Sequence, residues 1–351
     1  EESRESAFYI SCNRNKKSVT IDISSEDGQD LMRRLAGKSD VFLENFRVGG
    51  LRKYGLNVES LHAVNPGLVY CSITGFGQTG PYRDRPGYDG IFQAMGGLMS
   101  SIGHPDHLEN GGPLRVGPSI CDVICSFYAQ VAIISALYRR DASGGGGEYI
   151  DLALLDTSVA AMSHYASSYL VSGRVPPRRG NAGNGGVPSE AFQCSDGMIF
   201  VTAGNTAQYQ RLCRALGRQD LAEHPDYETG PLRIANRDDL TRDLRATFRD
   251  KTVAEWHERL LAADVPNAPG SDLAQVFADT QVLSRGMKVE VPHPTAGQAP
   301  LIANPIRFAT SPITNFRAPP VVGSHTDDVL SGLLGLGASG IEDLRRSGIR
   351  G

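Results

Sequence analysis

The sequence "VESLHAVNPGLVYCSITGFG" (residues 58–77) decides the fold, because its pattern changes from helical to extended part-way along. Apolar residues first recur at helical spacing and then form a short continuous run, which predicts a buried strand. The same order precedes it: a Ser-capped, acid-led stretch (residues 24–40) predicts a helix, and "VFLENF" (41–46) predicts a short buried strand. Alternating helices and strands with short connections indicate a parallel sheet in an α/β fold.

Further elements extend this pattern in both directions. "KSVTIDI" (17–23) alternates and predicts a strand, and two long apolar helices are expected over 117–140 and 151–173, around the turn "SGGGGE". A Pro/Gly-rich basic stretch (173–190) is a linker or a functional loop. A second α/β block follows it, with strands expected in 197–205 and 287–294, helices over 206–217, 237–249 and 252–264, and a last helix over 326–335.

Composition limits the class of protein. The 351 residues are 40% hydrophobic with a net charge of -4, which permits two domains and gives no excess positive charge for nucleic-acid binding. Six cysteines are too sparse for a disulfide scaffold, and neither Cys121 and Cys125 nor His104 and His107 have the partners of a zinc site. We count no apolar run of about 18 residues and no signal peptide, so we expect a cytoplasmic protein without membrane, nucleic-acid or metal partners.

One acidic residue stands out in "GPSICDVICSFYAQ" (117–130), a stretch that is otherwise nearly uncharged. Asp122 has two readings from its neighbourhood alone. It caps a helix that begins near Val123, since Asp is a favoured N-cap residue, or it is a carboxylate kept for chemistry. The two roles are compatible, because a helix N-terminus stabilises a carboxylate.

Motifs in a fixed order make the chain resemble the class III CoA-transferases, the family of formyl-CoA transferase and the carnitine CoA-transferase. The resemblance covers essentially the whole chain and implies that an upstream strand–helix unit, which helps to bind CoA in the family, is absent from it. The motifs are "NRNKKSVTIDI" (13–23), "ENFRVGGLRKYGL" (44–56), "ITGFGQTGPYRDRPGYDGIFQAMGGL" (73–98), "RVGPSICDV" (115–123), "GGGEYIDLALLD" (145–156), "RRGNAGNGG" (178–186) and "GSHTDDVLSGL" (323–333).

The resemblance implies a domain arrangement. A large Rossmann-like, CoA-binding domain is expected over 1–178, with a glycine-rich loop at 179–189 and a small α/β domain at 190–298. The chain is then expected to return to the large domain over 299–351. The family also implies a homodimer of two interlocked chains.

The implied activity moves CoA from an acyl-CoA donor, with succinyl-CoA as our choice, to a carboxylic acid. Asp122 falls at the family's catalytic aspartate. Its carboxylate would attack the thioester to give a mixed anhydride, and the CoA thiolate would convert this anhydride to an aspartyl-CoA thioester. CoA is then a substrate and product, and no metal is needed.

Further site residues follow from the same motifs. Tyr88 and Asp89 would contact substrate, and Gly185 and Gly186 belong to a loop that covers the active site in the family, here interrupted by Asn184. Ser24 stands where the family often has Lys. The expected CoA-binding residues are Ile21, Asp22, Asn45, Phe46, Arg47 and Lys53.

The sequence leaves two alternative functions open. The related α-methylacyl-CoA racemases resemble "GHD" around position 88, and Tyr88 is a poor replacement for a histidine base. A non-catalytic CoA-binding protein is the other alternative, against which Asp122 and Tyr88 together argue. Without the family, Tyr88 would be a half-buried tyrosine with its hydroxyl paired, Asp156 a structural residue, the glycine-rich loop a linker and the basic residues a solvated turn.

Overall fold

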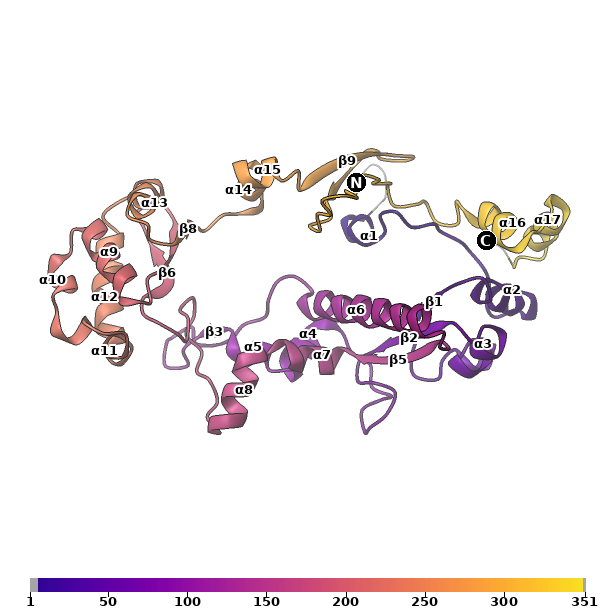
Figure 1. Ribbon diagram of the computed structural model, residues 1–351, viewed down its shortest axis with the longest axis horizontal. Coiled ribbons are helices and arrows are strands. Elements are labelled where there is room, and N and C mark those ends of the chain that lie inside the picture. Colours follow the sequence, from indigo (N-terminus) through magenta and orange to yellow (C-terminus); the bar gives the residue numbers. More distant parts are fainter. Residues whose placement is uncertain (1–5, 350–351) are drawn as a thin grey trace. The chain divides into compact units, whose positions relative to one another are not determined.

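The computed structural model describes residues 6–349 and divides the chain into two compact units (Figure 1). The first unit comprises Glu1–Leu98, Val116–Leu170 and Phe277–Gly351, and the second comprises Met99–Arg115 and Val171–Val276. The domain boundaries expected from the sequence stay a prediction.

The first unit contains a parallel three-stranded sheet, which confirms the α/β class. Its strands are β1 (Val41–Glu44), β2 (Val69–Thr74) and β5 (Glu148–Ala153), in the order β1-β2-β5. The central strand β2 is almost wholly buried. The expectation of a buried strand at 41–46 is wrong in its burial, because β1 lies at an edge and leaves Leu43 56% exposed.

Helices connect and cover these strands. α2 (Glu26–Ala36) begins where the sequence predicts, with the Ser25 side chain accepting a hydrogen bond from the Gly28 backbone N–H, and α3 (Val58–Val64) precedes β2. α6 (Ile120–Ser143) runs along β2 and β5 (Figure 1). Two antiparallel pairs of strands, β3 (Gly103–His104) with β4 (Gly112–Pro113) and β9 (Lys288–His293) with β10 (Gly297–Ile302), form further small sheets. The other helices outside the core of the second unit are α1 (Ala7–Cys12), η1 (Arg52–Tyr54), α4 (Asp89–Met95), α5 (Leu98–Ser101), α7 (Leu154–Ala161), α8 (Ser163–Ser172), α14 (Leu273–Ala278), α15 (Thr280–Ser284), α16 (Thr326–Leu334) and α17 (Ala338–Arg346).

Two expected elements are wrong. Residues 17–23 form no strand, because their backbone N–H groups bond to scattered acceptors, such as Thr326 Oγ1 for Thr20 and the Ile349 carbonyl for Asp22. The single helix expected over 151–173 is instead strand β5 followed by α7 and α8. The break between these two helices lies at Ser163, whose φ of 46° is incompatible with a right-handed helix.

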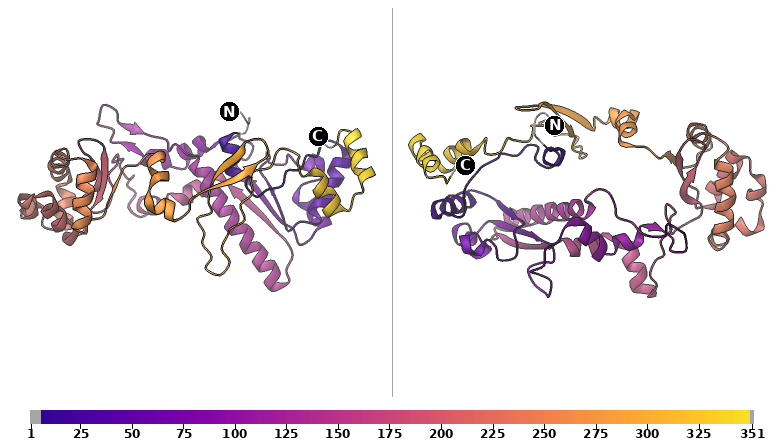
Figure 2. Two further views of the ribbon diagram at one scale, coloured as in Figure 1. Left: turned by 90° about the horizontal axis from the view of Figure 1, so that it is seen from above. Right: turned by 180° about the vertical axis from the view of Figure 1, so that it is seen from behind.

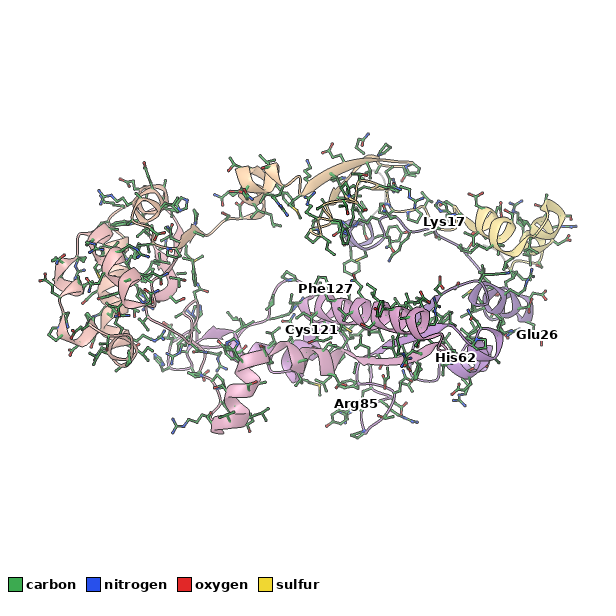
Figure 3. The ribbon with its side chains drawn as sticks, in the orientation of Figure 1. Lys17, Glu26, His62, Arg85, Cys121 and Phe127 are labelled. Atoms are coloured by element: carbon green, nitrogen blue, oxygen red, sulfur yellow. The ribbon has the colours of Figure 1, made fainter. Side chains whose placement is uncertain are left out.

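The helix α6 has one buried face and one exposed apolar face. Cys121, Cys125, Ala129 and Ala136 are buried, whereas a stripe of large apolar side chains is exposed. Figure 3 labels one residue of each face, Cys121 and Phe127. By length and composition alone, α6 could cross a membrane. The prediction that the sequence contains no apolar stretch of that length is therefore wrong. The stripe consists of Val123, Phe127, Val131, Ile134 and Tyr138.

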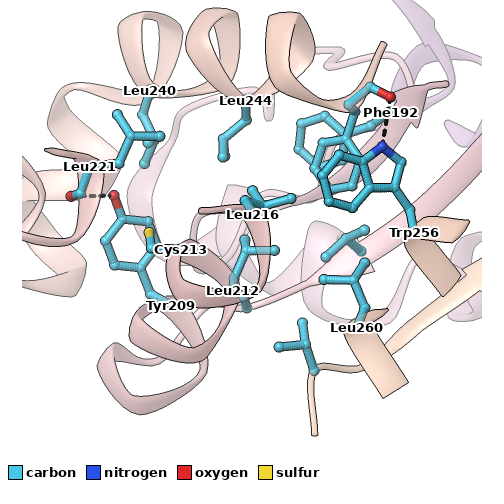
Figure 4. Close-up of a cluster of buried hydrophobic side chains, with 14 of the residues drawn as sticks. Phe192, Tyr209, Leu212, Cys213, Leu216, Leu221, Leu240, Leu244, Trp256 and Leu260 are labelled. Carbon is cyan, nitrogen blue, oxygen red and sulfur yellow. Dashed lines mark hydrogen bonds between the residues drawn. The ribbon is translucent and has the colours of Figure 1, made fainter. Parts of the chain in front are cut away.

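The second unit has its own hydrophobic core, which lies between an antiparallel sheet and a group of helices. Figure 2 shows the ribbon of this sheet and these helices from two further sides. The strands and helices expected at 197–205, 206–217, 237–249 and 252–264 are confirmed. The Trp256 indole N–H donates to the Phe248 carbonyl at 2.9 Å, and the Tyr209 hydroxyl donates to the Leu221 carbonyl at 2.9 Å. Figure 4 shows Trp256, Tyr209 and Leu221 within this core. The elements are β6 (Ser189–Gln193), β7 (Met198–Thr202), β8 (Asn267–Pro269), α9 (Thr206–Leu216), α10 (Gln219–Ala222), η2 (Pro225–Tyr227), α11 (Gly230–Ala235), α12 (Arg237–Phe248) and α13 (Val253–Ala262).

Two buried arginines fasten the glycine-rich loop to this unit. Arg233 is 0% exposed, and its guanidinium donates to the carbonyls of Val187 and Gly204, each at 3.0 Å. Arg237 donates to the carbonyls of Gly183 and Gly185 at 2.9 and 3.1 Å. Because a buried guanidinium needs its donors satisfied, these bonds fix the loop backbone at both ends of "GNGGV".

We expect Gly186→Ala to destabilise the second unit by about 1–3 kcal/mol, because a Cβ there would lie 2.7 Å from the Gly204 Cα. Gly185→Ala is the matched control. Its added Cβ would meet no atom within 4 Å, so it should change the free energy of unfolding by less than about 0.5 kcal/mol. Urea unfolding of both variants measures the difference, and equal midpoints would contradict the tight packing at Gly186.

Candidate active site

The position of α4 in the first unit depends on a buried aromatic ring. Phe92 is fully buried and packs edge-on against Phe76, with ring centroids 5.3 Å apart. A Cβ at Gly87 would lie 2.1 Å from the Phe92 ring, and one at Gly75 would lie 2.9 Å from it. The glycines in "TGFG" and "RPGYDG" therefore make room for Phe92, which brings the start of α4 toward the core.

Asp89, at the start of α4, caps the neighbouring helix α6. It is 7% exposed, and its Oδ1 accepts a hydrogen bond from the Cys121 backbone N–H at 2.9 Å. Its Oδ2 accepts from the Gln93 side-chain amide at 2.6 Å. Because the first N–H groups of a helix have no partner within the helix, this carboxylate supplies one from another element.

Asp122 lies inside the first turn of α6, so the hypothesis that it caps the helix is wrong. The helix begins at Ile120, ahead of the predicted start near Val123, and Asp89 holds the N–H that precedes Asp122. The Asp122 side chain is exposed and has no hydrogen-bond or ion-pair partner among residues 6–349. The Asp122 carboxylate is therefore not engaged by the rest of the described chain.

The surroundings raise the pKa of the Asp122 carboxyl. Partial desolvation by the packed helices is the larger cause, and repulsion from the Asp89 carboxylate is the second. The neighbouring thiols Cys121 and Cys125 also have raised pKa values because of burial, so they are neutral at physiological pH. With its pKa raised in this way, the Asp122 carboxylate is a stronger base than an ordinary aspartate.

Tyr88 is 79% exposed at the N-cap position of α4. Its carbonyl accepts the Ile91 N–H at 2.8 Å, and its hydroxyl has no hydrogen-bond partner among the described residues. The alternative of a half-buried tyrosine with a paired hydroxyl is therefore wrong. Tyr88 adjoins Asp89 in the chain, so an exposed ring and a buried carboxylate alternate at the start of the same helix.

Four of the expected CoA-binding residues follow β1, at the carboxyl end of the sheet where α/β proteins bind ligands. Asn45, Phe46 and Arg47 are exposed directly after the strand, and the Phe46 N–H donates to Glu44 Oε2 at 2.7 Å. Lys53, on η1, lies with its Nζ 4.6 Å from the Tyr54 ring centroid. Neither Arg47 nor Lys53 forms an ion pair with any carboxylate in the described part of the chain.

The other two expected CoA-binding residues lie ahead of α2. The Asp22 carboxylate accepts hydrogen bonds from the Ser24 hydroxyl and backbone N–H at 2.7 and 2.8 Å, and these bonds lower its pKa. Ile21 packs on the cluster formed by Leu31, Leu330 and Ile349. Ser24, which departs from the lysine common in the family, thus closes a turn here. These contacts belong to the protein itself, so a role in CoA binding stays a prediction for both residues.

Gly185 and Gly186 belong to the second unit, whereas Asp122 belongs to the first. The loop that contains both glycines is also bridged within itself, since Arg179 Nε donates to Asn184 Oδ1 at 2.6 Å. Asn184 therefore has a definite contact where the family has glycine. The role of this loop as an active-site cover stays a prediction.

Sequence reasoning missed Gln93, a fully buried amide four residues after Asp89. The spacing of the two residues in "YDGIFQ" places both on one face of α4. A polar residue among Ile91, Phe92 and Met95 was the available signal. Across residues 6–349, no cluster of three or more His, Cys, Asp or Glu side chains is arranged to hold a metal ion.

Comparison with known proteins places this geometry in a family. The model of CoA-transferase family III matches residues 1–326. The chain is 36% identical over 345 residues to the human succinyl-CoA:glutarate CoA-transferase, covering 98% of this chain and 78% of that protein. It is 39% identical over 337 residues to a succinate–glutarate CoA-transferase of Agrobacterium fabrum, covering 95% and 82% respectively.

A solved structure agrees with this assignment. The fold is similar to that of a CAIB/BAIF family protein from Brucella suis, with a TM-score of 0.84 and 38% sequence identity, over 94% of this chain and 84% of that one. The family predicted from the motifs is confirmed. The chain belongs to CoA-transferase family III and is a CoA-transferase, for which CoA is a substrate.

Proposed function

We propose that this enzyme transfers CoA from succinyl-CoA to a dicarboxylic acid such as glutarate, with Asp122 as the covalent carrier. The observation that carries the mechanism is the Asp122 carboxylate itself, which is exposed, unpaired among the described residues and raised in pKa at the start of α6. The substrate pair is supported by the names of the relatives, which are 36 and 39% identical to this chain.

The chemistry requires only one side chain. An Asp122 oxygen attacks the thioester carbonyl, the C–S bond breaks, and CoA departs as a thiolate. The product on the enzyme is a mixed anhydride between the Asp122 carboxyl and the acyl group of the donor. The thiolate then attacks Cγ of Asp122, which releases the donor as a carboxylate and forms an aspartyl-CoA thioester. The incoming carboxylate attacks the same carbon, the C–S bond breaks, and CoA thiolate is expelled as a second mixed anhydride forms. The thiolate finally attacks the acyl carbonyl of this anhydride, which gives the new acyl-CoA and releases the Asp122 carboxylate. Asp122 is regenerated with no net proton transfer.

A carboxylate suits this reaction better than a hydroxyl or thiol nucleophile. The anhydride keeps most of the activation of the thioester, whereas an oxygen ester on serine would lose it. The racemase alternative is not favoured by the site, since position 88 holds an exposed tyrosine in place of the histidine base.

The residues after β1 would bind the phosphates and adenine of CoA. Arg47 and Lys53 provide free positive charge for the phosphates, and the exposed rings and amides after β1 provide contacts for the adenine. Ile21 and Asp22 would border this site from the segment ahead of α2. Tyr88 would contact the acyl portion near Asp122. The oxygens of the buried Asp89 carboxylate accept hydrogen bonds from Cys121 and Gln93, and its expected contact with substrate stays a prediction. The cytoplasmic location and the lack of membrane and nucleic-acid partners stay predictions.

The wild-type protein should form glutaryl-CoA from succinyl-CoA and glutarate, and Asp122→Asn should reduce kcat by roughly 10³-fold or more, because an amide cannot form the anhydride. Mass spectrometric assay of the CoA esters measures both results. A fully active Asp122→Asn protein would refute the carrier role.

The matched control is the double variant Arg47→Ala with Lys53→Ala. It removes charge at the expected CoA site and leaves Asp122 intact, so it should raise KM for succinyl-CoA about tenfold or more and change kcat less. Asp122→Asn should show the reverse pattern, with CoA affinity retained. The same loss of kcat in both variants would point to a general structural defect.

The rate should also report the raised pKa of Asp122, because only the ionised carboxylate attacks. Activity should fall as the pH drops through a value above the ordinary aspartate pKa of about 3.9. Asp89→Asn removes the neighbouring negative charge, so its acid limb should move to lower pH. The other titrating neighbours, Cys121 and Cys125, are uncharged in this range. Comparing kcat profiles with the same substrates cancels substrate titration, and a shift to higher pH would contradict the account.

We further propose that the apolar stripe on α6 is covered by a second copy of the chain, as the family implies. Large exposed apolar patches on a helix of this kind are typical of interfaces. Ile134→Glu should therefore lower the sedimentation coefficient from that of a dimer to that of a monomer, whereas Thr206→Glu, at an exposed position of the second unit, should not. A monomeric wild type that binds lipid vesicles would favour membrane association instead.

A further inference from the structure

A buried amide on α4 joins two segments that meet at the start of α6. Gln93 is 0% exposed, and its Oε1 accepts the Val116 N–H at 2.9 Å. Its Nε2 donates to the Val116 carbonyl at 3.3 Å and to Asp89 Oδ2 at 2.6 Å. The donors and the acceptor of this side chain are thus all used, so its orientation is fixed by three hydrogen bonds.

The two partners of Gln93 lie on either side of the approach to Asp122. Val116 precedes "GPSICD", the segment that leads into the helix. Asp89 holds the backbone N–H of Cys121, the residue immediately before Asp122. The N-cap residue of α6, Ser119, makes no side-chain capping bond, so Asp89 is the side chain that caps this helix.

The fit between α4, α6 and α7 leaves little freedom for these groups. A Cβ at Gly96, which follows α4, would lie 2.6 Å from the Ser158 Cβ on α7. Cys121 and Cys125 on α6 are buried, and their thiols interact with Ser158 and Thr157 of α7. Gln93 therefore holds the entry to α6 against a packed background, where small displacements are resisted.

We propose that Gln93 is a positioning residue for CoA transfer, which acts through Asp89 and Val116 to hold the first turn of α6 so that the Asp122 carboxylate faces the thioester. This inference rests on the proposed carrier role of Asp122. Gln93 is buried and does not touch substrate. A displacement of a reacting group by about 1 Å reduces the rate by about 10²-fold, so loss of this clamp is expected to act on kcat.

The first test is Gln93→Met, which keeps the volume of the side chain and removes its three hydrogen bonds. We expect kcat to fall about 10- to 100-fold while KM for succinyl-CoA changes less than about threefold, because the hydrogen bonds of Gln93 go to Asp89 and Val116 and to none of the expected CoA-binding residues. A purely structural defect would instead lower the fraction of active enzyme, measured by active-site titration, and leave kcat per active site unchanged. That result would overturn the inference.

The second test exchanges donor and acceptor between the two residues. Asp89→Asn and Gln93→Glu singly break the bond between positions 89 and 93. The double variant restores it, with the new amide donating to the new carboxylate, and keeps acceptors for the Cys121 and Val116 N–H groups. We expect kcat of the double variant to exceed the product of the single effects by about tenfold. If Gln93→Met does not fold, the comparison of the double variant with the single variants tests the positioning role of Gln93.

The outcomes separate this inference from the proposed function. If Asp122→Asn is inactive but the double variant shows no rescue and Gln93→Met keeps full kcat per active site, the positioning role fails and the carrier role stands. If Asp122→Asn is active, the carrier role itself fails, whatever the Gln93 variants do. Rescue in the double variant together with an inactive Asp122→Asn supports both.

Discussion

The hydrogen bond from the Cys121 backbone N–H to the buried Asp89 carboxylate is the contact on which the candidate active site depends. This hydrogen bond caps α6 and fixes the backbone immediately before Asp122 in the first helical turn. It also places a second negative charge, that of Asp89, near Asp122. The same contact explains why the Asp122 side chain is free: a helix capped by another element does not need its own acid for that purpose. One helix terminus thus carries a buried carboxylate that caps it, Asp89, and an exposed carboxylate without a hydrogen-bond partner among the described residues, Asp122.

Both units use buried charge to hold backbone in place. In the first unit, a carboxylate accepts a backbone N–H. In the second, the guanidinium groups of Arg233 and Arg237 donate to backbone carbonyls of the glycine-rich segment. Burying such groups is unfavourable unless every donor and acceptor is paired, and the pairing makes the held segment well defined. The loops in question are those that the family resemblance associates with chemistry.

The sequence predicted the parallel α/β class and three helices of the second unit, because these depend on local periodicity. The motifs predicted the family, which is confirmed, whereas the catalytic role of Asp122 stays a prediction. The sequence failed where tertiary contacts decide. The alternating residues 17–23 find no neighbouring strand, and the helix expected over 151–173 is replaced by the end of β5, α7 and α8, with a left-handed Ser163 between the two helices. Asp122 was open to a capping role because nothing local shows that Asp89, far away in the chain, already caps α6. The contacts of Gln93, Arg233 and Arg237 could not be predicted for the same reason.

Covalent capture at Asp122 tests the central claim most directly. Wild-type protein incubated with succinyl-CoA and hydroxylamine, without an acceptor acid, should be converted to a hydroxamate at Asp122, because hydroxylamine attacks Cγ of the activated carboxyl group. Peptide mass spectrometry locates the mass change, and omission of succinyl-CoA is the control. Modification of the peptide 117–130 at Asp122 alone is the predicted result. An unmodified Asp122 in protein that turns over succinyl-CoA would contradict the account.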